Sequence, residues 1–171
     1  MSILLIDPPE ELGAAVVRQL LSEGDEVRVL SRERARTQYW KELGAHVAVG
    51  DPADDDLVER AALNVRTIVL LNWEEDFAAK TESVVRACKN SGVGRVVISA
   101  RKVKARVVED LERLDIDYVL LVLKRRLIGD AVEPEAVARA VSAADDLAGE
   151  PRLTIDLTDP RAWEALRLSV P

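Results

Sequence analysis

Short apolar runs alternate with segments of helical periodicity along the whole chain. The runs are rich in Val, Ile and Leu and are bounded by turn residues. This pattern is typical of strands that are covered on both faces of a sheet. The predicted strands are residues 3–6, 27–30, 46–49, 67–71, 95–99, 118–123 and 153–157.

Between these runs, apolar residues recur three and four positions apart, which predicts one buried face of a helix. Helices are expected from Pro8 up to Gly24, and then at about 32–43, 55–63, 77–90, 105–114, 137–144 and around Trp163. Regular alternation of strand and helix predicts a Rossmann-like, doubly wound α/β fold. We expect a mostly parallel sheet of about six to seven strands, with helices on both faces, in one domain over residues 1–171.

The composition narrows the classes of partner. The formal charge is −7, from 24 Lys and Arg against 31 Asp and Glu. A nucleic-acid-binding chain normally carries a basic surplus, so neither nucleic acid nor an anionic membrane surface is expected as a partner. The single cysteine, Cys88, has no intrachain partner for a disulfide, and no export signal or bilayer-length segment is visible. A cytoplasmic location is therefore expected.

Several stretches resemble a known family. They are 15–21 with 26–32, 42–45 leading to 50–51, 84–88 followed by 91–93 and 95–99, 109–111 with 117–118, and 132–140. Together they resemble the NmrA-like branch of the atypical short-chain dehydrogenase/reductases, which are NAD(P)-binding Rossmann proteins. The resemblance covers nearly the entire chain and implies the same fold.

The likeness breaks at the glycine-rich turn. Members of the family carry G-x-x-G-x-x-G between the first strand and the first helix. Asp7, Glu10 and Gly13 stand at those three positions here. Only Gly13 is retained, as a candidate cofactor contact that also lets the helix pack closely on the sheet.

The substitutions in this turn oppose the binding of a diphosphate. Pro8 and Pro9 have no N–H to donate, and three carboxylates (Asp7, Glu10 and Glu11) stand where an anionic ligand would lie. We predict that Asp7 is the N-cap, with Pro8 at N1 and Glu10 at N3 as in a capping box. Lost donors and charge repulsion would weaken binding by roughly two to four orders of magnitude. We therefore expect no cofactor, with NADP or an adenosine nucleotide left open as the ligand.

Features of the adenosine side of the site remain. The resemblance implies a contact of Arg32 with the 2′-phosphate of NADP and of Asp51 with adenine. Trp73 follows a strand at the carboxyl edge, where ligands of open α/β sheets bind. Each has a simpler alternative: a surface arginine, an Asp-Pro turn, and a tryptophan in packing or at an interface.

No catalytic set is assigned. The resemblance implies a tyrosine with a lysine four residues later, beside a serine after the fifth strand. Ser99 is near that strand end, but Tyr118 has Val122 four positions on. Lys102 and Lys104 have no tyrosine partner and are expected to be solvated charges. The segments at 101–104 and 124–130, which cover the substrate in relatives, are short, so a closed site for hydride transfer is not expected.

Other chemistries have less support. His46 has no Cys or His at metal-ligand spacing, so no metal is expected. Cys88 falls on the apolar face of a helix and is interpreted as packing. The aspartates at 51 and 54–56 are interpreted as a turn and an acidic helix start. Trp40 and Trp163, on peripheral helices, are candidates for a subunit contact.

Three functions follow as hypotheses. The leading one is a non-catalytic or regulatory pseudoenzyme of the NmrA-like type that acts through a small ligand or a protein partner. The second is an NAD(P)-dependent oxidoreductase or isomerase with a non-standard cofactor pose. The third is an oligomeric scaffold subunit. Relatives often pair through the helices here expected at 77–90 and 105–114, which implies a homodimer.

Overall fold

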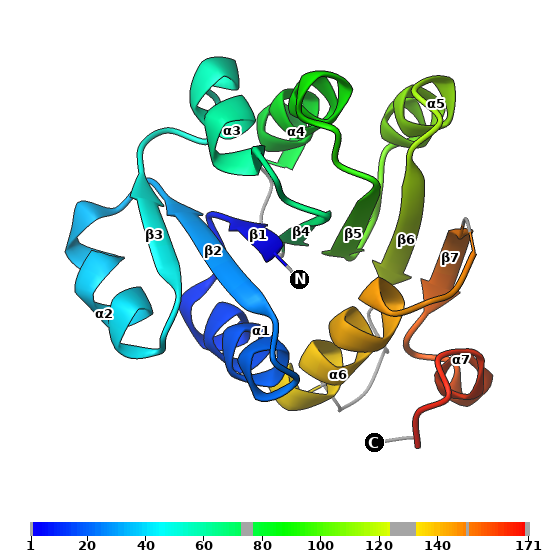
Figure 1. Cartoon of the computed structure of the whole chain (residues 1–171). Helices are drawn as coiled ribbons and strands as arrows, with labels where there is room; N and C mark the ends of the chain where they lie inside the picture. Colours follow the sequence, from blue (N-terminus) through cyan, green and yellow to red (C-terminus); the bar gives the residue numbers. More distant parts are fainter. Residues whose placement is uncertain (1, 73–76, 124–132, 150, 170–171) are drawn as a thin grey trace.

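One parallel sheet contains all the strands that the structure describes. The computed structural model describes residues 2–72, 77–123, 133–149 and 151–169. The strands are β1 (Ser2–Ile6), β2 (Glu26–Ser31), β3 (His46–Val49), β4 (Thr67–Asn72), β5 (Arg95–Ala100), β6 (Asp117–Val122) and β7 (Arg152–Asp156). They pair in the order β3-β2-β1-β4-β5-β6-β7, every pair parallel (Figure 1). The Rossmann-like fold expected from the sequence is confirmed.

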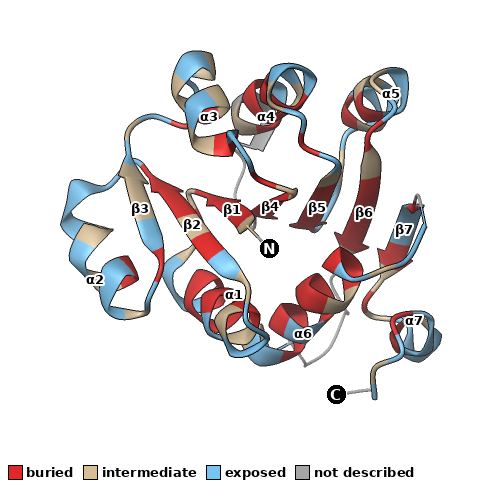
Figure 2. Cartoon of the chain, in the orientation of Figure 1, coloured by how far each residue is buried: buried red, intermediate tan, exposed pale blue. Residues whose placement is uncertain are grey.

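Helices cover both faces of this sheet (Figure 1). The helices on one face are α1 (Glu10–Ser22), α2 (Thr37–Glu42), α6 (Pro134–Asp145) and α7 (Pro160–Ala165). Those on the other face are α3 (Asp55–Ala62), α4 (Phe77–Ser91) and α5 (Ala105–Arg113). Alternate side chains of each strand therefore enter two separate hydrophobic cores, as Ile3 and Leu5 do on one face and Leu4 and Ile6 on the other. Figure 2 shows the buried residues concentrated along the strands and the inward faces of the helices.

The strand order reverses between β1 and β4, which are direct neighbours, with Ile3 paired to Thr67. Chain segments that leave the carboxyl ends of β1, β2 and β4 therefore meet above this point. Open α/β sheets bind ligands at such a switch point. The fold thus places residues 7–13, the segment after Ser31 and the start of α4 around one candidate site.

Two predictions about the periphery were wrong. The helix expected at 32–43 is divided into a 3₁₀ turn, η1 (Arg34–Arg36), and the short helix α2. Trp40 and Trp163 are buried at 0% and 1% exposure, and so are not available for a subunit contact. Both indoles belong to the same hydrophobic core as α1 and α6, and Trp163 Nε1 donates to Leu157 O at 3.1 Å. Their large apolar surface is better stabilised in this core than in water.

No helix in the described part of the chain combines the length and the apolar character needed to cross a membrane.

Candidate functional site

The turn after β1 is built on Asp7, whose backbone lies in the left-handed region with φ of 42°. Asp is one of the few residues besides Gly that tolerate this conformation. The Asp7 N–H donates to Leu30 O at 2.6 Å, which fixes the turn against the end of β2. The chain thus makes a turn at the first glycine position of the family motif without a glycine.

The predicted capping box does not form. Helix α1 begins at Glu10, Pro9 is its N-cap, and no side chain caps it. The reason is the proline pair: a residue followed by proline is held in extended conformation, so Pro8 cannot be the first helical residue. The two prolines therefore lie ahead of the helix and remove N–H donors from the turn itself.

The Asp7 carboxylate is bound by two cations and a backbone N–H. Its Oδ2 lies 2.9 Å from Arg32 Nε and 3.0 Å from Lys80 Nζ, and its Oδ1 accepts from the Arg32 backbone N–H at 3.2 Å. The side chains of Asp7 and Lys80 are each only 16% exposed, whereas that of Arg32 is 45% exposed. Three segments, following β1, β2 and β4, therefore converge on one internal anion, which we call the Asp7 clasp (Asp7, Arg32 and Lys80).

Gly13 performs the packing role predicted for it. A Cβ at this position would lie 2.7 Å from Pro8 Cβ and 2.9 Å from Trp40 Cη2. The Pro8 ring and the Trp40 indole therefore close directly over the backbone of α1. As a cofactor contact, Gly13 remains a prediction.

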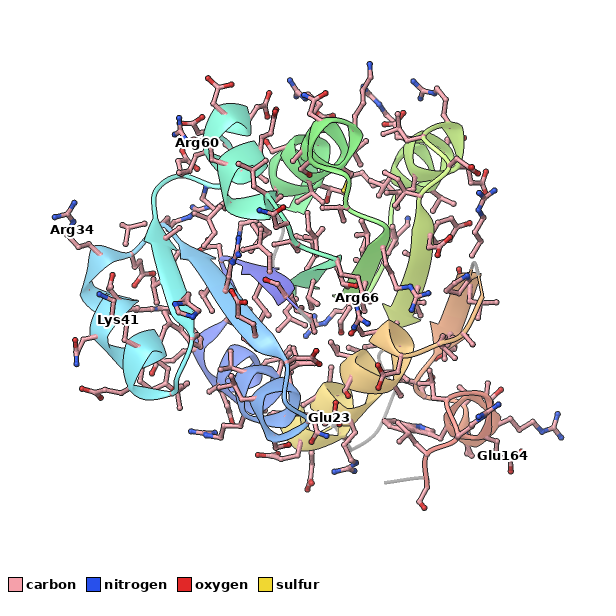
Figure 3. All side chains as sticks on the ribbon, in the orientation of Figure 1. Glu23, Arg34, Lys41, Arg60, Arg66 and Glu164 are labelled. Atoms are coloured by element: carbon pink, nitrogen blue, oxygen red, sulfur yellow. The ribbon has the colours of Figure 1, made fainter. Side chains whose placement is uncertain are left out.

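The other predicted cofactor residues are only partly brought together. Arg32 is at the site, but its guanidinium is bound by Asp7. Asp51 is exposed after β3, and its carboxylate accepts the Ala53 N–H at 2.9 Å, as in an Asp-Pro turn. Trp73 lies outside the described residues. Arg36 pairs with Glu33 at 2.8 Å, and Arg34 projects outward from η1 into solvent (Figure 3).

The residues considered for catalysis lie in unsuitable surroundings. Ser99 is fully buried at the end of β5, so its hydroxyl does not face solvent. Tyr118 is at the amino-terminal end of β6, whereas Asp7 follows the carboxyl end of β1, so the two lie at opposite ends of the parallel strands. The Tyr118 hydroxyl donates to Glu112 Oε1 at 3.0 Å. Burial, with the Glu112 hydrogen bond, raises the pKa of Tyr118 above 10.0, opposite to what a catalytic tyrosine needs.

The remaining reactive side chains are structural. Cys88 is buried in α4, and burial raises the pKa of its thiol to about 12, so it is inert as a nucleophile at neutral pH. His46 is exposed at the start of β3. Within the described ranges, no group of His, Cys, Asp and Glu side chains could hold a metal ion.

Lys80 was missed by the sequence reasoning. It lies in the first turns of α4, after the strand next to β1, but nothing in its local sequence distinguishes it from a solvated lysine. Only the parallel pairing of β1 with β4 brings the Lys80 ammonium group to Asp7. Chemically, Arg32 and Lys80 together are suited to bind a phosphate, and here they bind a carboxylate of the chain itself.

Comparison with known proteins places the chain among nucleotide-binding proteins. A family model described as NAD(P)H-binding matches residues 11–126, starting just after the turn that contains Asp7. The chain is also 36% identical over 69 residues to the photosystem II assembly factor Ycf39 of Cyanophora paradoxa. That match covers 40% of this chain and 22% of the relative, so the chain spans well under two thirds of that protein.

Solved structures share the fold at low sequence identity. The anaerobillin reductase ChuY from Escherichia coli O157:H7 has a TM-score of 0.68 at 14% identity, over 90% of this chain and 95% of that one. A triphenylmethane reductase of Citrobacter sp. complexed with NADP(H) has a TM-score of 0.72 at 14% identity, over 91% and 69%. A putative NAD-dependent epimerase/dehydratase from Bacillus halodurans has a TM-score of 0.71 at 14% identity, over 90% and 92%. At such identities the likeness establishes the fold alone.

Proposed function

The chain belongs to the NAD(P)H-binding family, and we propose that it is a non-catalytic or regulatory member of the NmrA-like type with impaired dinucleotide binding. It acts, on this proposal, through a small ligand or a protein partner. The observation that carries the proposal is the Asp7 clasp, in which an internal carboxylate occupies the cations of the switch point.

An external phosphate competes poorly with the Asp7 carboxylate. Asp7 is part of the chain and is already held by its turn, so its binding to the two cations costs little conformational entropy. A dissolved ligand, by contrast, loses translational and rotational entropy when it binds. Displacing Asp7 would also leave a mostly buried carboxylate without its cations, which is unfavourable. The two prolines remove donors that relatives use in the same turn. These effects act in the same direction, against NAD(P) at this position.

The surroundings of Tyr118 and Ser99 add support. A tyrosine acts as acid or base in this family only where its hydroxyl reaches the substrate and a lysine lowers its pKa. Tyr118 is hydrogen-bonded to Glu112 and has its pKa raised, and Ser99 is enclosed by the sheet. Neither residue supports hydride transfer at the carboxyl edge.

The alternative is an NAD(P)-dependent oxidoreductase or isomerase with a non-standard cofactor pose. Family membership and the fold shared with a reductase complexed with NADP(H) favour it. Arg34, exposed on η1 two positions after Arg32, offers a further cation for a 2′-phosphate. The proposed pose would use Arg34 and leave the Asp7 clasp intact.

A titration with NADPH distinguishes the two functions. We expect the wild-type protein to show no saturable binding at micromolar NADPH, followed by calorimetry or by tryptophan fluorescence. Asp7→Gly removes the competing carboxylate, keeps a residue suited to φ of 42°, and exposes Arg32 and Lys80 to the ligand. We expect its affinity for NADPH to be at least about tenfold higher than that of the wild type.

Glu164→Gln is the matched control, because it removes one negative charge at an exposed position on α7, far from the site (Figure 3). Its affinity should equal that of the wild type. Saturable micromolar binding of NADPH to the wild type would reject the proposal in favour of the enzyme. If neither variant nor wild type binds a nucleotide and the chain sediments as a tight oligomer, the scaffold hypothesis gains.

A further inference from the structure

A groove lies between α4 and α5, which are side by side on the same face of the sheet (Figure 1). It consists of a cavity of 310 Å³ that continues into a second one of 170 Å³, and the two share Glu82, Val85, Arg106 and Asp110. Val85, Val107 and Leu114 supply apolar surface to it. The lining extends from position 104 to 114 along α5, about 15 Å at 1.5 Å per residue.

The groove is cationic although the chain is acidic. Five basic side chains line it: Arg86, Lys89, Lys104, Arg106 and Arg113. Only two acidic side chains, Glu82 and Asp110, do so. The formal charge of the whole chain is −7, so this excess of positive charge is local, and the rest of the chain carries a net negative charge.

Part of this positive charge is available for a partner. Arg86 is held by Asp55 of α3 at 2.7 Å, and Arg113 is paired with Asp110. Arg106, by contrast, is 76% exposed and lies 3.9 Å from Glu82 and 3.8 Å from Asp110, near the limit of an ion pair. Lys89 and Lys104 are exposed and have no ion-pair partner among the described residues.

We propose that this groove binds an acidic amphipathic segment of a partner protein. An amphipathic helix or strand would place apolar side chains on Val85, Val107 and Leu114 and carboxylates beside Lys89, Lys104 and Arg106. The groove is too open to enclose a small organic ligand, since Arg86, Arg106 and Arg113 are 62%, 76% and 72% exposed.

A second copy of the chain fits the groove less well. In a two-fold dimer the same surface faces itself, so Lys89, Lys104 and Arg106 of one groove would meet the same cations of the other. Glu82 and Asp110 of each copy already lie beside arginines of their own groove. The homodimer implied by the family resemblance therefore faces like-charge repulsion at these helices, whereas an acidic partner is attracted.

This inference concerns a different surface from the Asp7 clasp and goes beyond the proposed function by naming the chemistry of a protein partner. It rests on the proposed function only in that a partner is expected. The two can fail separately, because nucleotide binding tests the clasp and peptide binding tests the groove.

The test uses a fluorescein-labelled peptide of about 15 residues in which Leu recurs at helical spacing and Glu fills the other face. Fluorescence anisotropy should show saturable binding to the full chain, and an otherwise identical peptide with Lys in place of Glu should not bind. Arg106→Glu and Lys89→Glu should each weaken binding by about tenfold or more, equivalent to about 1.4 kcal/mol. Lys89→Gln should have a smaller effect in the same direction.

Lys41→Glu is the matched control, because it reverses one exposed charge on α2, on the other face of the sheet (Figure 3). It should change the affinity by less than about twofold. Far-UV circular dichroism verifies that each variant is folded. The proposal is overturned if the acidic peptide does not bind saturably, or if Lys41→Glu weakens binding as much as the groove variants. Sedimentation showing a dimer that Arg106→Glu dissociates would assign the groove to a second copy instead.

Discussion

At the scale of single residues, the first and third positions of a glycine motif have opposite outcomes. Asp7 replaces a glycine and keeps the left-handed turn, because Asp tolerates that conformation. Its carboxylate then changes the chemistry of the site by binding Arg32 and Lys80. Gly13 is retained because a Cβ would collide with Pro8 and Trp40, which is a requirement of packing. A glycine retained from a cofactor-binding motif can thus be required by the packing of the fold, and its presence alone does not indicate that the cofactor binds.

Gly13→Ala should destabilise the protein. The added Cβ would lie 2.7 Å from Pro8 Cβ, and overpacking of this kind costs about 1–3 kcal/mol, against a gain of about 1 kcal/mol from the helix preference of Ala. We expect a net loss of up to about 2 kcal/mol in the free energy of unfolding, measured in urea. Gly94→Ala is the control, since its Cβ would be no closer than 3.9 Å to Arg66 O. An unchanged midpoint for Gly13→Ala would contradict the close packing.

At the scale of elements, two arginines fasten the end of α6 to the sheet. Arg95, at the start of β5, donates to Ala144 O at 3.4 Å and also to the carbonyl of Asp145. Arg66, just before β4, pairs with the Asp145 carboxylate. These contacts satisfy carbonyls at the carboxyl end of a helix, where positive charge is favourable. They also bury a carboxylate, and burial raises the pKa of Asp145 above 3.8.

The raised pKa of Asp145 gives a signed prediction for stability. A carboxyl group whose pKa is higher in the folded state holds its proton more tightly there. Its stabilising contribution is therefore fully present below pH 3.8 and is lost as pH rises through the folded pKa. Compared with Asp145→Asn, which does not titrate, the wild-type chain should lose stability as the pH rises from 3.8 through the folded-state pKa of Asp145. Urea unfolding of both proteins across this range measures the difference.

A relative gain of wild-type stability over the same pH range would contradict this expectation. It would mean that the pairing of Asp145 with Arg66 outweighs the cost of burying the carboxylate. Because the variant differs only at the titrating group, other carboxyls contribute equally to both curves. The comparison therefore isolates Asp145.

At the scale of the whole molecule, one sheet joins all the described strands, and each face carries its own core. Trp40 and Trp163 lie beside opposite edges of the sheet, on α2 next to β3 and on α7 next to β7, yet share one core (Figure 1). A continuous core of this kind transmits the loss of packing from one end to the other. We therefore expect the described residues to unfold as a single cooperative unit.

The unfolding of the two edges should coincide. In a Trp73→Phe background, Trp40→Phe leaves Trp163 as the one indole of the chain, and Trp163→Phe leaves Trp40. Urea midpoints from fluorescence and from far-UV circular dichroism should agree within each variant. Two separate midpoints, one for the α2 edge and one for the α7 edge, would show that the two ends of this core unfold independently. The wild-type protein is measured in parallel, which corrects for the stability that each substitution removes.

Secondary structure was predictable where local sequence and tertiary environment agree. The strands run within about one residue of their predicted limits, because aliphatic runs fit only a sheet that is covered on both sides. The segment 32–43 was wrong as one helix: Ser31 to Arg36 contains alternating charges with no apolar face, and only Trp40 anchors the short helix that follows. The predicted cap at Asp7 was wrong because Pro9 holds Pro8 in an extended conformation, so that the helix begins only at Glu10.

By itself, the sequence determined the fold class and the loss of the glycine-rich turn, because periodicity and the identity of Asp7, Pro8 and Pro9 are local properties of the chain. The tertiary structure alone decided that Lys80 and Arg32 bind the Asp7 carboxylate. It also decided that five basic side chains from α4 and α5 share one groove. Both depend on which strands and helices become neighbours, and charges that are distant in sequence interact only once the sheet is assembled.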